Sequence, residues 1–68
     1  MPPTVAEALR RALAAANRAG ATAAAIYLTD ADHDELNRPT RQGRVPVYRG
    51  KGLIFSFIVT DDGNHVML

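Results

Sequence analysis

One short stretch of the chain carries four acidic residues: Asp30, Asp32, Asp34 and Glu35. Alternating aspartates are typical of the start of a calcium-binding loop, but such a loop needs glycine at its sixth position and a bidentate glutamate at its twelfth. Glu35 and Arg41 occupy those positions, so calcium binding is not predicted. Two interpretations remain, a solvated first helical turn or an anionic patch for a basic partner. In the patch, Asp30 and Asp34 would lie about 6 Å apart along a helix axis, comparable to the spacing of phosphates on a strand.

The charged residues of the next stretch, residues 36–60, are all positive. Basic side chains with an aromatic neighbour are typical of phosphate contacts, and arginine also binds carboxylates through its planar fork. The stretch therefore predicts contact with nucleic acid or with an acidic protein surface. The glycines on either side of Lys51 lack the rest of a phosphate-binding loop, and we interpret them as a turn. The basic residues are Arg38, Arg41, Arg44, Arg49 and Lys51, with Tyr48 among them.

No arrangement of residues predicts catalysis. The imidazoles, His33 and His65, are not spaced to converge with a carboxylate or a nucleophile, and Ser56 lacks the flanking residues of an activated serine. A chain of 68 residues can hardly enclose a substrate pocket of several hundred Å³ and keep a core. We therefore expect no enzymatic activity, no metal and no cofactor.

Composition predicts a single domain spanning residues 1–68. Cysteine is absent, which excludes disulfides and thiolate metal sites and favours a reducing compartment. Pro2 and Pro3, with no basic residues beside them, argue against a signal peptide, and no apolar run approaches the roughly 18 residues of a membrane span. We therefore expect a soluble, cytoplasmic protein.

The first element is predicted to be a helix that ends at Arg18. Thr4 and Glu7 match a capping box, and Gly20 is placed for a left-handed C-cap. A buried stripe recurs at helical spacing, formed by Val5, Leu9, Ala12, Leu13 and Ala16.

The most apolar stretch, residues 53–60, is predicted to be the central strand. Side chains alternate across a strand, so one face is fully apolar and should pack on the helix. The opposite face is half apolar and, through Ile54 and Ile58, is a candidate contact for a homodimer. The helix-facing set is Leu53, Phe55, Phe57 and Val59, and the opposite set is Ile54, Ser56, Ile58 and Thr60.

Further strands are predicted at residues 22–28, 45–48 and 65–68, a short helix at about residues 30–37 before Pro39, and a loop at residues 40–43. Pro46 cannot donate to a ladder, which places its strand at an edge or a bulge. Together the elements predict an α+β fold, in which an N-terminal helix packs on a mainly antiparallel sheet of three to four strands in the order α-β-α-β-β-β. The last three strands should form an antiparallel meander.

The ensemble of a capped, alanine-rich helix, an acidic short helix after Ile26-Tyr27-Leu28-Thr29, and residues 45–52 leading into a terminal hairpin resembles small accessory proteins of phages and prophages. Among these it is similar to the anti-CRISPR class. That resemblance implies a stoichiometric inhibitor that occupies a surface of a CRISPR effector complex, often the positive channel for target DNA. The acidic stretch would be the matching feature, although the net charge of +1 differs from strongly acidic DNA mimics.

The leading prediction is thus a phage-encoded, non-enzymatic inhibitor that binds a bacterial defence complex in the cytoplasm of the infected host and blocks binding of its nucleic-acid target. The acidic stretch would make the contact, with the arginines and Tyr48 as a second surface. The alternative is a small nucleic-acid-binding or regulatory protein that uses the basic residues of segment 38–51. A third is a homodimeric structural subunit.

Overall fold

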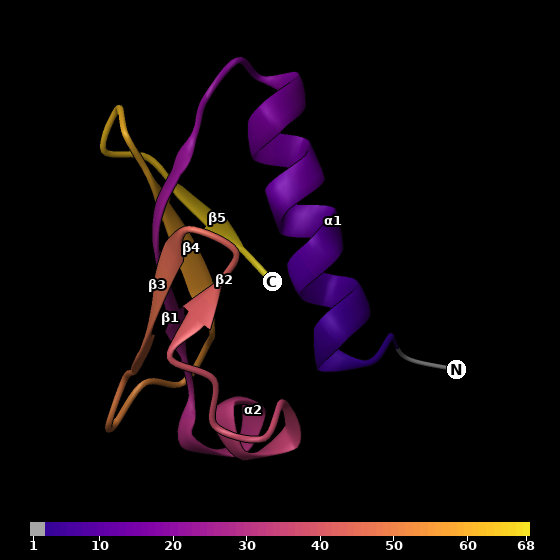
Figure 1. Ribbon diagram of the computed structural model, residues 1–68, viewed down its shortest axis with the longest axis vertical. Coiled ribbons are helices and arrows are strands. Elements are labelled where there is room, and N and C mark those ends of the chain that lie inside the picture. The colour runs from indigo at the N-terminus through magenta and orange to yellow at the C-terminus, as the bar shows by residue number, and fades with distance from the viewer. Residues whose placement is uncertain (1–2) are drawn as a thin grey trace.

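The computed structural model describes residues 3–68, and the chain adopts an α+β fold with a five-stranded mixed sheet among them. The strand order is β2-β3-β1-β4-β5. Helix α1 lies along one face of the sheet, and α2 lies at one end of it (Figure 1). The elements are α1 (Val5–Arg18), β1 (Ala23–Leu28), α2 (Asp30–Glu35), β2 (Arg41–Gln42), β3 (Val45–Arg49), β4 (Phe57–Thr60) and β5 (His65–Met67).

Helix α1 begins and ends where its capping residues predict. The Thr4 hydroxyl accepts a hydrogen bond from the Glu7 amide at 3.1 Å. At the other end Gly20 has a φ of +79°. Its amide donates to the Asn17 carbonyl, and the next amide donates to the Ala16 carbonyl, which is the Schellman arrangement. Glycine suits this position because it has no Cβ to oppose a positive φ.

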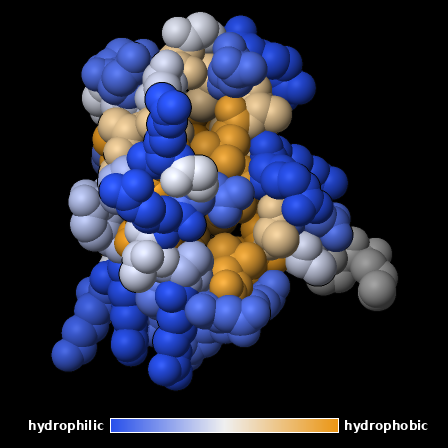
Figure 2. Space-filling model, in the orientation of Figure 1, coloured by the Kyte–Doolittle hydropathy of each residue, from blue (hydrophilic) through white to orange (hydrophobic). Residues whose placement is uncertain are grey.

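The core lies between α1 and the sheet. Small alanines on α1 let the helix approach the strands closely, so that large side chains of the sheet become fully buried. Figure 2 shows apolar surface running between the helix and the sheet, with hydrophilic residues on both sides. The buried apolar residues are Leu9, Ala12 and Ala16 of α1 and Ile26, Leu28, Val47 and Ile58 of the sheet.

The predicted meander is only partly correct: β4 and β5 pair antiparallel as expected, but β1 is the central strand and lies between β3 and β4. Strand β1 pairs in parallel with β3, where Tyr27 lies opposite Tyr48, and antiparallel with β4, where Tyr27 lies opposite Phe57. Parallel neighbours need a long crossover, and residues 29–44 supply one. The connection between β3 and β4 then crosses the end of β1, where the Gly50 amide donates to the Leu28 carbonyl at 2.7 Å.

The predicted faces of residues 53–60 are inverted. The strand begins only at Phe57, and Ser56, Ile58 and Thr60 are buried on the helix side. Ile54 is 83% exposed and Phe55 is 66% exposed, in the loop before the strand. Ile58 is fully buried, so it is not available for a homodimer contact with Ile54.

Strand β2 and the position of Pro46 also differ from the predictions. Residues 41 and 42, expected in a loop, pair antiparallel with β3, so that β3 is not an edge strand. Pro46 instead marks where the parallel ladder starts: pairing of β3 with β1 begins at Val47. The Gly50 amide donates toward β1, so by alternation the backbone nitrogen of Pro46 faces β1 as well, and it has no hydrogen to donate.

Candidate functional site

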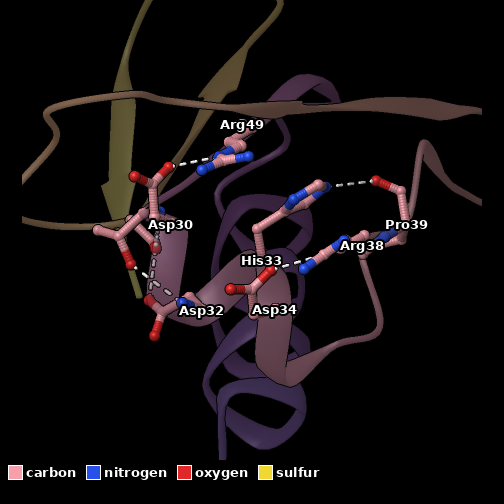
Figure 3. A network of polar contacts seen from close by, with 9 residues as sticks. Asp30, Asp32, His33, Asp34, Arg38, Pro39 and Arg49 are labelled. Carbon is pink, nitrogen blue, oxygen red and sulfur yellow. Dashed lines mark hydrogen bonds and ion pairs between the residues drawn. The ribbon is translucent and has the colours of Figure 1, made fainter.

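The acidic residues of α2 are engaged with the rest of the molecule. Arg49 Nε donates to Asp30 Oδ1 at 2.6 Å, and Arg38 Nε donates to Asp34 Oδ1 at 2.8 Å (Figure 3). The hydrogen bond from Arg49, followed by its positive charge, holds the pKa of Asp30 below its ordinary value. Two of the predicted acidic contacts therefore already have a cationic partner within this chain.

The other two acidic side chains connect α2 to its neighbours. The Ser56 hydroxyl accepts a hydrogen bond from the Thr29 amide at 2.9 Å and donates one to Asp32 Oδ2 at 2.5 Å. Glu35 Oε2 accepts a hydrogen bond from the Val5 amide at 3.0 Å, at the positive end of α1. The acidic segment therefore joins α1, β1 and the start of β4.

The five basic residues do not form one cluster. Arg38 and Arg49 lie in the ion pairs with α2, while the remaining three are exposed. Arg44 precedes β3 and Lys51 follows it, so the five-residue strand separates them by about 16 Å. Arg41 lies opposite Pro46 on β2, and its side chain therefore points to the same side of the sheet as Tyr48.

His33, on α2, contacts the segment that follows its helix. It is partly buried, and its Nε2 lies 2.9 Å from the Pro39 carbonyl oxygen. A carbonyl only accepts hydrogen bonds, so Nε2 carries the proton in this arrangement. The contact holds the segment after α2, and the described residues contain no group of three side chains that could hold a metal ion.

An aromatic row crosses the sheet on the face opposite α1, which we call the open face. Ring centroids of Tyr48 and Tyr27 lie 5.3 Å apart, those of Tyr27 and Phe57 also 5.3 Å, and those of Phe57 and His65 4.9 Å. The interplanar angles are 24–27°. The row therefore runs through β3, β1, β4 and β5 in one continuous stack.

The geometry of this row limits what it can bind. The centroid spacing is close to the roughly 4.8 Å between neighbouring strands, so each ring turns its face toward the next ring. Within the row, the faces of Tyr27 and Phe57 are covered by the neighbouring rings. The row therefore presents ring edges, not ring faces, to the outside. Sequence reasoning missed the row because it depends on which strands are neighbours. The alternation around Tyr27 was the available signal, since Ile26 and Leu28 on either side are apolar.

A shallow apolar hollow adjoins the row on the open face. Its volume is about 470 Å³. Besides Ile54 and Phe55, Met67 is largely exposed, at 54%. Val66 packs on the core, so Met67 and His65 point to the open face by alternation. The lining residues are Gly52, Leu53, Ile54, Phe55, Phe57, His65 and Met67.

The open face thus gathers three exposed large apolar side chains, Ile54, Phe55 and Met67, around one hollow. No helix within residues 3–68 is long and apolar enough to cross a membrane. In comparisons with protein-family models, curated proteins and solved structures, no match to this chain was found.

Proposed function

We propose that this chain is a non-enzymatic binding protein that contacts a partner protein through the open face. The observation that carries the proposal is the exposure of Ile54, Phe55 and Met67 around one hollow. Large apolar side chains gathered at a surface are typical of protein contact sites, where aromatic residues and methionine are enriched.

The charged residues support a protein partner over a nucleic acid. Unpaired bases bind to free aromatic faces beside a positive groove. Here the inner faces of Tyr27 and Phe57 are stacked against neighbouring rings, and Arg38 and Arg49 are paired with aspartates. Nucleic-acid binding by Arg41, Arg44 and Lys51 is the alternative that the experiments below distinguish.

The resemblance to the anti-CRISPR class supplies the partner in this proposal. The chain would bind a CRISPR effector complex of a bacterial host as an inhibitor and block its access to target nucleic acid. The contact would centre on the open face. Asp30 and Asp34 then act by holding Arg49 and Arg38.

The test compares two double variants in a CRISPR interference assay. Ile54→Ser with Phe55→Ser removes the most exposed apolar side chains of the open face, and both lie outside the strands, so the fold should be retained. Inhibition should fall by at least about tenfold, because apolar anchors dominate protein interfaces. Arg44→Ser with Lys51→Ser is the matched control and should inhibit like the unmodified chain.

Two results would contradict the proposal. The first is unchanged inhibition by the Ile54 and Phe55 variant. The second is binding to DNA or RNA that weakens steeply as salt is raised and that disappears in the Arg44 and Lys51 variant, because this behaviour identifies phosphate contacts. That second result would establish the alternative.

A further inference from the structure

Strand β5 leaves one of its edges unpaired in the described part of the chain, since it is the last strand of the sheet. The Leu68 amide donates to the Ser56 carbonyl at 3.1 Å, and the Thr60 amide donates to the Asn64 carbonyl at 2.9 Å. Backbone groups alternate in direction along a strand, so the N–H and C=O groups of residues 64, 66 and 68 point toward β4. The N–H and C=O groups of His65 and Met67 therefore point outward.

A groove runs beside this edge, between β5 and α1. Its volume is about 460 Å³. The floor consists of small or apolar side chains, because α1 presents alanines to it, and two arginines of α1 also line it. The lining includes Ala8, Ala15, Val66, Met67 and Leu68 with Arg11 and Arg18.

The two arginines give the groove a positive charge. Arg11 and Arg18 are seven residues apart, about 10 Å along the helix axis. Neither forms an ion pair with another residue in the range 3–68, unlike Arg38 and Arg49. An extended segment with acidic side chains four residues apart spans about 13 Å, so its carboxylates can reach both guanidinium groups.

We propose that the β5 edge binds an extended acidic peptide of a partner as an additional strand. The outward groups of His65 and Met67 would pair with the peptide backbone, which is the usual source of affinity in strand addition. On the side facing α1, an apolar side chain would enter the groove, and an acidic side chain at each end would pair with Arg11 or Arg18. The groove lies on the α1 side of the sheet and the hollow lies on the open face, and Met67 lines both.

Charge repulsion disfavours a second copy of this chain as the partner that binds the β5 edge. Two copies paired through β5 around a two-fold axis normal to the sheet would place their α1 helices on the same side. Arg11 and Arg18 of each copy would then approach those of the other, and β5 itself brings no acidic residue. Like charges at such a contact are unfavourable, whereas an acidic peptide complements them.

The probe is a capped heptapeptide, TETVTET, titrated into the full chain and followed by amide NMR. We expect binding at up to millimolar peptide, with slower hydrogen exchange at the His65 and Met67 amides. The Val66 amide, which faces β4, should change little. The matched peptide TKTVTKT should bind at least about tenfold more weakly, because it places lysines beside Arg11 and Arg18.

Variants separate the backbone contact from the charges. Met67→Pro removes an outward N–H but no bond to β4, and it should abolish peptide binding, while Met67→Ala keeps the N–H and should bind. Arg11→Glu with Arg18→Glu should reverse the preference toward TKTVTKT. The control pair, Arg10→Glu with Arg44→Glu, changes net charge equally and should leave the preference unchanged.

Three outcomes would overturn the proposal. One is equal binding of the two peptides, and another is binding without protection of the His65 and Met67 amides. The third is concentration-dependent protection of these amides without peptide, which would show that a second copy occupies the edge. Loss of inhibition in the Ile54 and Phe55 variant, with peptide binding intact, would show that the two surfaces act separately.

Discussion

Ser56 joins three parts of the chain through one buried hydroxyl. It accepts from the Thr29 amide after β1, donates to Asp32 of α2, and precedes β4 in the chain. Buried polar groups are tolerated only when hydrogen-bonded, and Ser56 satisfies both its donor and an acceptor position. This explains why a serine occupies a core-facing position beside Ile58.

We expect Ser56→Ala to lower the free energy of unfolding by about 2 kcal/mol, because the Thr29 amide loses its partner inside the protein and Asp32 loses a donor. Urea denaturation measures the change. Thr40→Ala is the control, since the exposed Thr40 contributes its carbonyl and not its hydroxyl to the sheet, and it should change stability by less than about 0.5 kcal/mol. An equally small effect of Ser56→Ala would contradict the role assigned to this hydroxyl.

The contacts of single residues were only partly predictable. Local partners follow from sequence spacing, as in the cap that Thr4 forms with the Glu7 amide. Partners far apart in the chain do not: the ion pair of Asp30 with Arg49 depends on β3 lying beside β1. The sequence therefore predicted a free acidic patch, because this ion pair depends on the topology of the sheet.

The turn between β4 and β5 is held by Asp62. Its carboxylate accepts hydrogen bonds from the Thr60 hydroxyl and from the Asn64 amide, and these bonds, the first above all, lower the pKa of Asp62 below its ordinary value of 3.8. Gly63, with a φ of +86°, completes the turn. The charged form of Asp62 is therefore favoured by folding.

The lowered pKa of Asp62 determines in which direction folding stability changes with pH. Because the folded pKa is lower, the unfolded chain binds more protons at pH values near and below 3.8, and stability decreases as pH falls through the folded pKa. Between about pH 6 and about pH 2.5 the Tm of the unmodified chain should fall further than that of Asp62→Asn. Glu7→Gln, which removes a carboxylate elsewhere, is the control variant, and an identical fall for Asp62→Asn would contradict this reading.

At the scale of elements, the positions of helices and strands were more predictable than their pairing. Caps and glycines bounded α1, and the acidic residues after Thr29 placed α2. The meander prediction treated the glycines on either side of Lys51 as a hairpin turn between the strands at residues 45–48 and 53–60. In the fold that connection spans the end of β1, a neighbour relation that no local pattern of residues encodes.

Across the whole molecule, one face of the sheet is covered by α1 (Figure 1), and the other leaves large apolar side chains exposed. The helix-side residue Ile58 is fully buried, while Ile54, four positions earlier, is 83% exposed. The sequence predicted that the fully apolar face of this segment packs on the helix and that the half-apolar face lies opposite. The structure places the half-apolar face against the helix, where the buried Ser56 hydroxyl is hydrogen-bonded.

The same substitution at these two isoleucines should separate the faces. Ile58→Val should lower the free energy of unfolding by about 1 kcal/mol, because it removes a buried methylene from a packed core, whereas Ile54→Val should change it by less than about 0.3 kcal/mol. Urea denaturation of both variants measures this difference. Equal losses would show that Ile54 is covered in the folded monomer, and the open face would then not be available to a partner. An unchanged stability for Ile54→Val would show that the Ile54 side chain does not contribute to folding and is available for binding. The proposed function requires this difference between Ile54 and Ile58.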